Sequence, residues 1–281
     1  MSTDLPVRGA LLVTGAALMF ASMGGLIRHI SADLPNEQIV FFRNLFGLLI
    51  LIPVVWQRGE RIDLKTRNPG LHLVRSLFGL AAMYCFFYAL GVLPLADAVL
   101  LNFTAPLFIP FVAMLWLKER VSPRIWAAIF IGFSGVLLIL RPGGDLPASA
   151  ALIGLASGAF AGVAMVSLRK LSATEPALRV VVYYGVICTL VSTVPLLWAW
   201  QPINLRSLGI MAGAGSFATL GQYLLSRGYG CAPAAQIGPF TYASVVFAAL
   251  YGWLFWHELP GWATAGGTLL IMIAGALAMR R

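Results

Sequence analysis

The chain has 281 residues and a formal net charge of +9, and 60% of its residues are apolar while only 10% are charged. Soluble domains carry about 25% charged residues, and a soluble fold of this size has too little interior to bury so much apolar surface. Composition therefore excludes a soluble domain and fits poorly with a disordered chain or a disulfide scaffold. It indicates an integral membrane protein.

Ten apolar segments are long enough to cross a bilayer, since a spanning helix needs about 20 apolar residues. Short turn signals separate them, such as Pro69-Gly70 and Pro142-Gly143, and leave no room for a soluble domain. We predict an all-α integral membrane protein with ten transmembrane helices. The expected spans are Arg8–Ile30, Gln38–Trp56, Leu71–Leu90, Leu95–Leu117, Arg124–Leu140, Ala148–Leu168, Leu178–Trp200, Leu205–Ser226, Ala234–Trp256 and Gly261–Met279.

The basic residues predict the orientation of the chain. Most lysines and arginines fall in loops on the side that holds both termini, whereas only Arg28, Arg141 and Arg206 fall on the other side. Because cytoplasmic loops are enriched in positive charge, we expect both termini in the cytoplasm of a multi-pass protein of a bacterial-type inner membrane. The charge is not gathered on one face, so we expect no nucleic-acid partner.

Arg43 and Arg75 are the two arginines inside expected spans, each within two turns of a helix end. The simplest interpretation is that both side chains snorkel to the lipid headgroups. The alternative is that Arg43 attracts the carboxylate of a substrate.

The two halves of the chain repeat in order. Pro94 aligns with Pro233, and Glu119 aligns with Glu258. Five spans in each copy make the second copy enter the membrane from the opposite face, an inverted-repeat architecture common in secondary transporters. The predicted repeats are residues 1–143, with the first five helices, and residues 144–281, with the last five.

These motifs resemble the drug/metabolite transporter superfamily, in its members with two EamA-type repeats. The resemblance covers essentially the whole chain, although Val245 stands where the second copy would repeat Pro106. It implies a ten-helix carrier of small metabolites, and members of the family export aromatic or other amino acids, take up S-adenosylmethionine or move sugars. The residues that carry it are Pro94-Leu95-Ala96-Asp97-Ala98, Pro106 and Glu119 in the first copy, and Pro233-Ala234-Ala235 and Glu258 in the second.

Polar and proline residues inside spans indicate where a solute could bind. A proline in a membrane helix frees a backbone carbonyl, which protein or a water-filled cavity must satisfy, and an amide at that depth faces a cavity or another helix. Plain helix packing is the alternative role for every one of these side chains. The residues predicted to line a central substrate-binding cavity are Asn102, Tyr84, Tyr88, Tyr242, Gln222, Thr241, Pro106, Pro239, Met23 and Phe160.

We predict export of aromatic or neutral amino acids by alternating access through that cavity. Uptake of a nucleoside-like metabolite such as S-adenosylmethionine, and broad drug efflux, are the alternatives. No acidic residue falls at the middle of a span, so we expect proton coupling to be weak or absent and flux to run down the substrate gradient. The three cysteines are far apart and no metal-ligand spacing occurs, so neither a metal nor another cofactor is expected.

An intramembrane serine protease is a remote alternative, because Gly132-Phe133-Ser134-Gly135 matches the G-x-S-G string of rhomboid-type proteases. That chemistry needs a base beside the serine, and the three histidines lie near helix ends, so we expect no enzyme. Gly154, Gly158 and Gly162 permit close helix approach, either inside a monomer or at a dimer contact. The sequence leaves the oligomeric state open, with a slight preference for a monomer.

Overall fold

A computed structural model describes residues 4–57, 65–117, 123–140, 147–172, 174–229, 231, 238–259 and 261–279, and every regular element within these ranges is a helix. The boundary expected between residues 143 and 144 and the motif residue Glu119 lie outside the described residues. In chain order the helices are α1 (Asp4–Ile30), α2 (Asn36–Gln57), α3 (Pro69–Val92), α4 (Leu95–Asn102), α5 (Ala105–Leu117), α6 (Pro123–Leu140), α7 (Ala148–Ser172), α8 (Ala177–Ala199), α9 (Leu205–Tyr229), the 3₁₀ helix η1 (Gly238–Tyr242), α11 (Ala243–Trp256) and α12 (Trp262–Met279).

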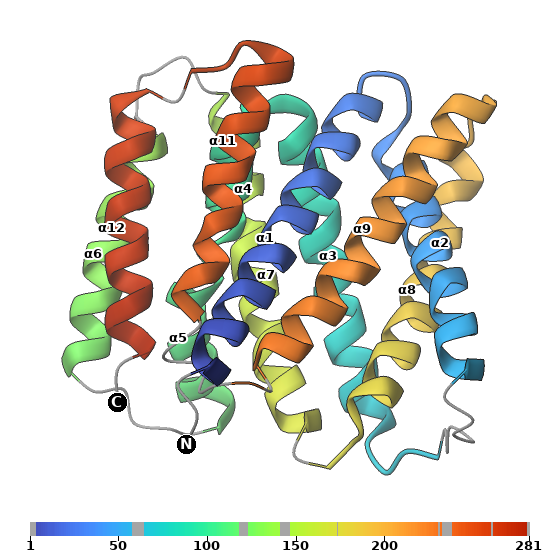
Figure 1. The fold of residues 1–281 in the computed structure, drawn as a ribbon, viewed down its shortest axis with the longest axis horizontal. Helices are drawn as coiled ribbons and strands as arrows, with labels where there is room; N and C mark the ends of the chain where they lie inside the picture. Colours follow the sequence, from blue (N-terminus) through green and yellow to red (C-terminus); the bar gives the residue numbers. More distant parts are fainter. Residues whose placement is uncertain are drawn as a thin grey trace.

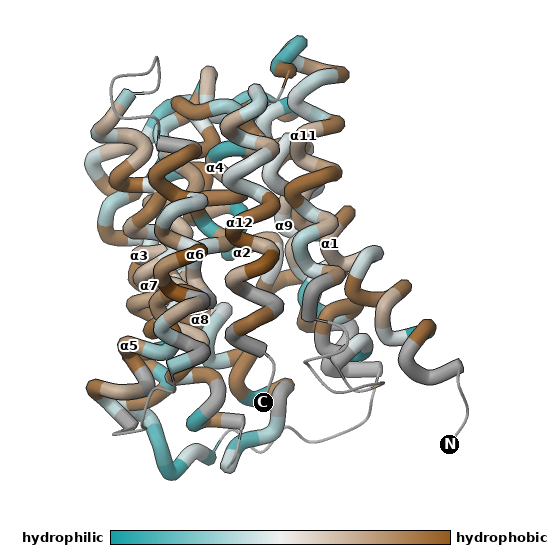
Figure 2. Tube along the Cα trace, turned by 90° about the vertical axis from the view of Figure 1, so that its left-hand side faces the viewer, coloured by the Kyte–Doolittle hydropathy of each residue, from teal (hydrophilic) through white to brown (hydrophobic). Residues whose placement is uncertain are grey.

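The lengths of these helices fit a membrane protein. Within the described residues, six segments are long and apolar enough to cross a bilayer, and they lie in α1, α3, the α4–α5 pair, α7, α8 and α9. Shorter apolar helices occur in α6, in η1 with α11, and in α12. Apolar residues run along the helices, and hydrophilic residues gather toward the ends of the bundle (Figure 2). The chain is a multi-pass membrane protein, while the count of ten spans stays a prediction.

The helices form two layers closed by a helix pair at each side (Figure 1). In one layer α1 packs along α9 and α11, and in the other α7 packs along α3, α4 and α5. The pair α6–α12 lies at one side and the pair α2–α8 at the other. We call the end where α1 begins and α12 ends the lower end, as drawn in Figure 1, and the opposite end the upper end.

The pairs of touching helices follow the predicted repeat. If α1, α2, α3, α4–α5 and α6 are exchanged in order with α7, α8, α9, α11 and α12, the contact α1–α9 becomes α7–α3, and α1–α11 becomes α7–α5. Both members of these two pairs occur, α2–α9 likewise corresponds to α8–α3, and α6–α12, α2–α8 and α4–α11 map onto themselves, whereas the contacts of α3 with α1 and α2 have at most a weak counterpart among the described residues. The two halves of the chain therefore pack in corresponding ways.

The fourth expected span is broken into α4 and α5. Pro106 has no N–H to donate to the carbonyl of Asn102, and a proline ring clashes with the preceding turn. The helix ends at Asn102, and Thr104 satisfies the carbonyl oxygen of Leu101 with its backbone N–H at 3.2 Å and its hydroxyl at 2.6 Å. In the second half, η1 contains Pro239 and precedes α11 in the same way.

The three glycines of α7 pack against this break. A Cβ atom at Gly158 would lie 2.1 Å from Oγ1 of Thr104 and 2.9 Å from the carbonyl oxygen of Leu101. A Cβ at Gly154 would lie 2.9 Å from the Leu101 side chain, and one at Gly162 would lie 3.1 Å from Phe108. Of the two interpretations of this glycine stripe, the structure supports close packing inside one chain.

Candidate substrate-binding site

An ion pair joins three helices at the upper end of the bundle. Nη2 of Arg28, near the end of α1, donates to Oε1 of Glu258, which follows α11. Nη1 of Arg28 donates to the carbonyl oxygen of Leu93, and Oε2 of Glu258 accepts the N–H of Leu95 at 3.0 Å. A carboxylate is favourable at that place because the first N–H groups of a helix have no partners within it. The pair therefore ties α1, the start of α4 and the end of α11 together.

The end of α11 directs Glu258 back toward α4. His257 adopts the left-handed conformation, with φ of 56°. The N–H of Glu258 donates to the carbonyl of Gly252 at 3.0 Å, and that of His257 donates to Trp253 at 3.2 Å. Bonds of this kind satisfy the last carbonyls of a helix and reverse the chain. The ion pair is thus positioned by backbone geometry.

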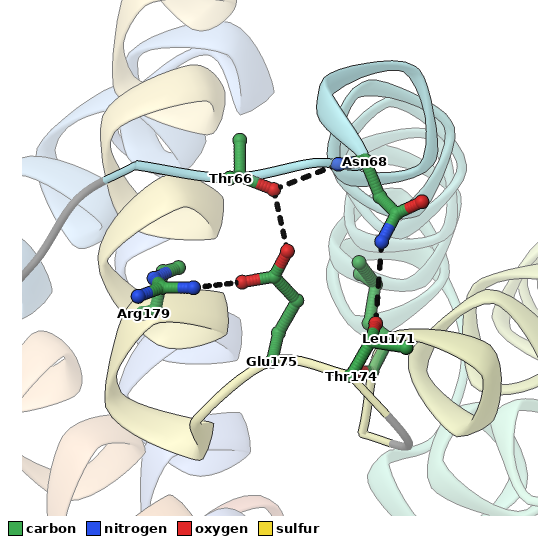
Figure 3. Close-up of polar contacts among 6 residues, drawn as sticks. All are labelled: Thr66, Asn68, Leu171, Thr174, Glu175 and Arg179. Atoms are coloured by element: carbon green, nitrogen blue, oxygen red, sulfur yellow. Dashed lines mark hydrogen bonds and ion pairs between the residues drawn. The ribbon is translucent and has the colours of Figure 1, made fainter.

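A second polar cluster lies at the lower end, between the start of α3 and the turn that joins α7 to α8 (Figure 3). The carboxylate of Glu175 accepts the Thr66 hydroxyl at 2.6 Å and a guanidinium N–H of Arg179. Beside it, Nδ2 of Asn68 donates to Oγ1 of Thr174 at 3.2 Å. The hydrogen bonds from Thr66 and Arg179 hold the pKa of the Glu175 carboxyl below its ordinary value of 4.5. This Glu175 cluster links the two halves at the lower end.

A third polar cluster lies within the membrane part, and we call Arg43, Arg75, Tyr184 and Cys188 the α2–α3–α8 cluster. Cζ of Arg75 lies 4.5 Å from the centroid of the Tyr184 ring. Nη1 of Arg43 donates to Oδ1 of Asn44 at 2.9 Å, and the Arg43 charge interacts with Tyr184 and Cys188. Within the part of the chain that the structure describes, the buried Nε atoms of both arginines have no hydrogen-bond partner. Arg75 therefore turns toward Tyr184 on α8, which does not fit the simple interpretation of snorkelling.

Four of the residues predicted to line the cavity lie between helices. Nδ2 of Asn102 donates to Oγ of Ser157 at 3.1 Å, and the buried hydroxyl of Tyr84 has no hydrogen-bond partner among the described residues. The ring of Tyr242 lies 5.6 Å from that of Phe103, and Met23 is part of the buried core. These contacts permit both cavity lining and plain packing.

The other six predicted residues lie on five different elements, with Pro239 and Thr241 together in η1. Tyr88 on α3 and Gln222 on α9 are exposed, and the ring of Phe160 lies 6.0 Å from that of Phe78. The carbonyl of Thr241 accepts the Ser244 hydroxyl at 3.0 Å. Pro106 lies in the first turn of α5 and Pro239 in η1, and the side chains of both lie outside the described part of the chain.

Two hollows in the described part of the structure lie elsewhere. A cleft of about 190 Å³ at the upper end is lined by residues that include Asp97, Glu258 and Thr264, and Thr264 donates to Asp97 at 2.9 Å. An adjoining apolar groove of about 380 Å³ beside α12 shares Ala96, Ala249 and Thr264 with this cleft and is also lined by Val245 and Met272. Neither hollow contains a predicted cavity residue, so a shared chamber for all ten stays a prediction.

The alignment of Glu119 with Glu258 in the two repeats singled out Glu258 from the sequence. It did not indicate that the ion-pair partner of Glu258 is Arg28. The Arg28–Glu258 pair and the Arg75–Tyr184 contact both connect residues more than a hundred positions apart. In the described part of the chain, no group of three or more metal-ligating side chains occurs.

The decisive observation on the class of protein comes from comparison with known families. The model of the EamA-like transporter family matches residues 7–141 and again residues 148–280. The chain belongs to the EamA-like transporter family. The resemblance stated from the sequence motifs is therefore confirmed, including the presence of two EamA repeats.

Relatives of this EamA-like transporter carry different names. It is 35% identical over 277 residues to the pseudopaline exporter CntI of Pseudomonas aeruginosa, which covers 98% of this chain and 96% of the relative. It is 28% identical to a riboflavin transporter of Vibrio cholerae, over 95% and 91% of the two chains. It is 25% identical to an S-adenosylmethionine uptake transporter of Rickettsia bellii, over 88% and 84%. These relatives are transporters of bacteria.

A solved crystal structure is also similar in fold to this EamA-like transporter. The TM-score is 0.66 at 20% sequence identity, with 96% of each chain covered. This likeness bears on the arrangement of the helices alone.

Proposed function

We propose that this transporter is a secondary carrier that exports small metabolites by alternating access between two inverted five-helix repeats. The observation that carries the proposal is the exchange of helix pairs between the halves, in which α1–α9 corresponds to α7–α3 and α1–α11 to α7–α5. Two similar halves of opposite orientation give outward-open and inward-open states of comparable energy. The excess of basic residues in the loops at the lower end favours a cytoplasmic position for that end.

The Arg28–Glu258 ion pair is the gate at the upper end in this proposal. It joins α1 of the first half to the end of α11 in the second half. Opening a passage between the halves at this end requires that this pair separates. Both partners then meet water, where their charges are solvated, so opening carries little electrostatic cost.

For the cargo, we infer aromatic or neutral amino acids and related amino-acid-like metabolites. The relative at 35% identity is named as an exporter, which favours the outward direction. The spans carry tyrosines and a few amides rather than many deep cationic groups, a lining that suits a neutral or zwitterionic solute better than a phosphorylated one.

Uptake of a nucleoside-like or flavin-like metabolite is the second candidate, because two relatives are named as a riboflavin transporter and an S-adenosylmethionine uptake transporter. The protease alternative lacks support. The Ser134 hydroxyl donates to the carbonyl oxygen of Phe130 at 2.9 Å, which is the ordinary bond of a serine within a helix.

Counterflow in proteoliposomes tests the proposal. Vesicles preloaded with unlabelled solute are given labelled tryptophan, phenylalanine, threonine, riboflavin or S-adenosylmethionine, with protein-free vesicles as the control. We expect accumulation of an amino acid and no dependence on an imposed pH gradient. Accumulation of riboflavin or S-adenosylmethionine alone would favour the second candidate. No accumulation of any of the five would contradict the proposed carrier, whereas uptake that follows the pH gradient would contradict only the expectation of weak or absent proton coupling.

A further inference from the structure

We propose that Arg43 and Arg75 form a carboxylate-binding subsite for the transported metabolite, on the face of α8 that carries Tyr184 and Cys188. The inference rests on the proposed function, and it names the chemical group of the cargo that the carrier recognises.

The two arginines lie within the membrane part of their helices. Arg43 is seven residues after the first residue of α2, and Arg75 is six residues after the first residue of α3. Each therefore lies about 10 Å along the axis from the start of its helix. Both side chains are half-buried. Arginines in membrane spans are costly and usually pair with an anion or face a water-filled space.

Neither arginine has an acidic partner among the described residues. In the described ranges of the chain, neither guanidinium forms an ion pair, and the ion pairs described are Arg28–Glu258 and Arg179–Glu175. The partners of the two arginines are neutral: the Asn44 amide for Arg43, and the Tyr184 ring for Arg75. A half-buried positive charge with neutral partners lacks the compensation that an anion supplies.

Both arginines lie on helices that pack against α8. The Arg75 guanidinium lies over the Tyr184 ring, and the charges of both arginines act on Tyr184 and Cys188. Each arginine also keeps its Nε–H buried without a partner among the described residues. Guanidinium N–H groups in a fixed fork match the two oxygens of a carboxylate. A carboxylate between them would supply both the missing charge and the missing acceptors.

Gly79 makes the position of the Arg75 side chain possible. A Cβ atom at Gly79 would lie 2.5 Å from Nη1 of Arg75 and 2.8 Å from Cε2 of Tyr184. The missing side chain leaves space for the guanidinium to lie over the tyrosine ring, where cation–π attraction holds it. The arginine is therefore held in place before any solute binds.

The first test uses the unmodified protein in the counterflow assay. For each accepted amino acid, the unlabelled acid and its carboxamide are compared as competitors, for example phenylalanine with phenylalaninamide. Loss of a charge-assisted contact to a carboxylate is expected to weaken competition by about 10- to 100-fold. Equal competition by acid and amide would overturn the proposal while leaving the transport function intact.

Variants supply the second test. Arg43→Gln and Arg75→Gln are each expected to reduce the preference for acid over amide, as is Gly79→Ala, which keeps both charges but displaces Arg75. The matched controls are Arg206→Gln, at an exposed arginine, and Gly70→Ala on α3, where a Cβ meets nothing within 4 Å. Size-exclusion profiles and melting temperatures show whether each variant is folded.

The outcomes separate this inference from the proposed function. If the wild-type protein accumulates none of the amino acids, the proposed function fails. If it transports, but folded Arg43→Gln and Arg75→Gln keep the full acid-over-amide preference, only the carboxylate subsite is overturned. Should the variants not fold, the comparison of acid and amide on the wild-type protein decides the question.

Discussion

Asn102 and Ser157 are joined by a hydrogen bond of 3.1 Å, from the amide Nδ2 to the hydroxyl oxygen, at the residue where α4 ends. The Ser157 hydroxyl in turn donates to the carbonyl of Gly154 at 2.6 Å. The bond crosses from the first half of the chain to the second, at the break in the fourth span. It places the Asn102 amide at the depth where the fourth span breaks.

Substitution of these two residues distinguishes a substrate contact from a packing contact. We expect Asn102→Ala to weaken apparent substrate affinity several-fold, and Ser157→Ala to lower only the free energy of unfolding, by about 1 kcal/mol. Counterflow at varied solute concentration gives the affinity, and thermal unfolding in detergent gives the stability. If both variants lose stability equally and neither changes affinity, Asn102 is a packing residue.

Gly158 is predicted to be intolerant of a side chain. An added Cβ would meet the Thr104 hydroxyl at 2.1 Å and the Leu101 carbonyl oxygen at 2.9 Å. A hydroxyl can rotate, but a backbone carbonyl cannot move without shifting the helix end, so we expect Gly158→Ala to cost about 1–3 kcal/mol. Gly209→Ala is the control, because a Cβ there meets nothing within 4 Å. Melting temperatures that fall equally in the two variants would contradict the packing described for α7.

The positions of the spans could be predicted from sequence because each depends on a local run of apolar residues. The expected span Ala148–Leu168 became α7 (Ala148–Ser172), and Leu178–Trp200 became α8 (Ala177–Ala199). The break at Asn102 was predictable only as a disturbance near Pro106, because the residue at which a helix yields depends on which neighbours satisfy the freed carbonyl.

The side chains around the candidate subsite could not be predicted in the same way. Nothing local to Arg75 shows that its guanidinium lies over Tyr184, which is on α8. Snorkelling is the sound expectation for an arginine near a helix end, and it fails here because the space left by Gly79 gives the side chain a closer partner. Contacts of this kind depend on the packing of distant helices.

Acid is predicted to weaken the Glu175 cluster at the lower end. Its hydrogen bonds to Thr66 and Arg179 depress the pKa of the carboxyl below 4.5, so the folded state binds a proton less readily than the unfolded chain. The cluster therefore contributes its full stability above pH 4.5 and loses it as the pH falls through the lowered pKa. We expect Glu175→Gln to lower the melting temperature at pH 7, and the difference from wild type to shrink toward pH 3. Glu37→Gln is the control, and a pH-independent difference for Glu175→Gln would contradict the linkage.

Cross-linking is predicted to arrest transport when it holds the upper end closed. Cysteines replace Arg28 and Glu258 in a background in which Cys85, Cys188 and Cys231 are serine or alanine. A cleavable bifunctional thiol reagent is preferred to a disulfide, because two long side chains meet here and a disulfide spans only about 4.4–6.8 Å between Cα atoms.

Joining α1 to the end of α11 prevents the separation that opening requires, since Arg28 and Glu258 belong to different halves of the chain. We therefore expect counterflow to fall to the level of protein-free vesicles after cross-linking and to recover after cleavage of the reagent. The variants Arg28→Cys and Glu258→Cys, each alone, control for modification of a single thiol. Full counterflow by protein shown on a gel to be cross-linked would mean that the halves do not part at this end during transport.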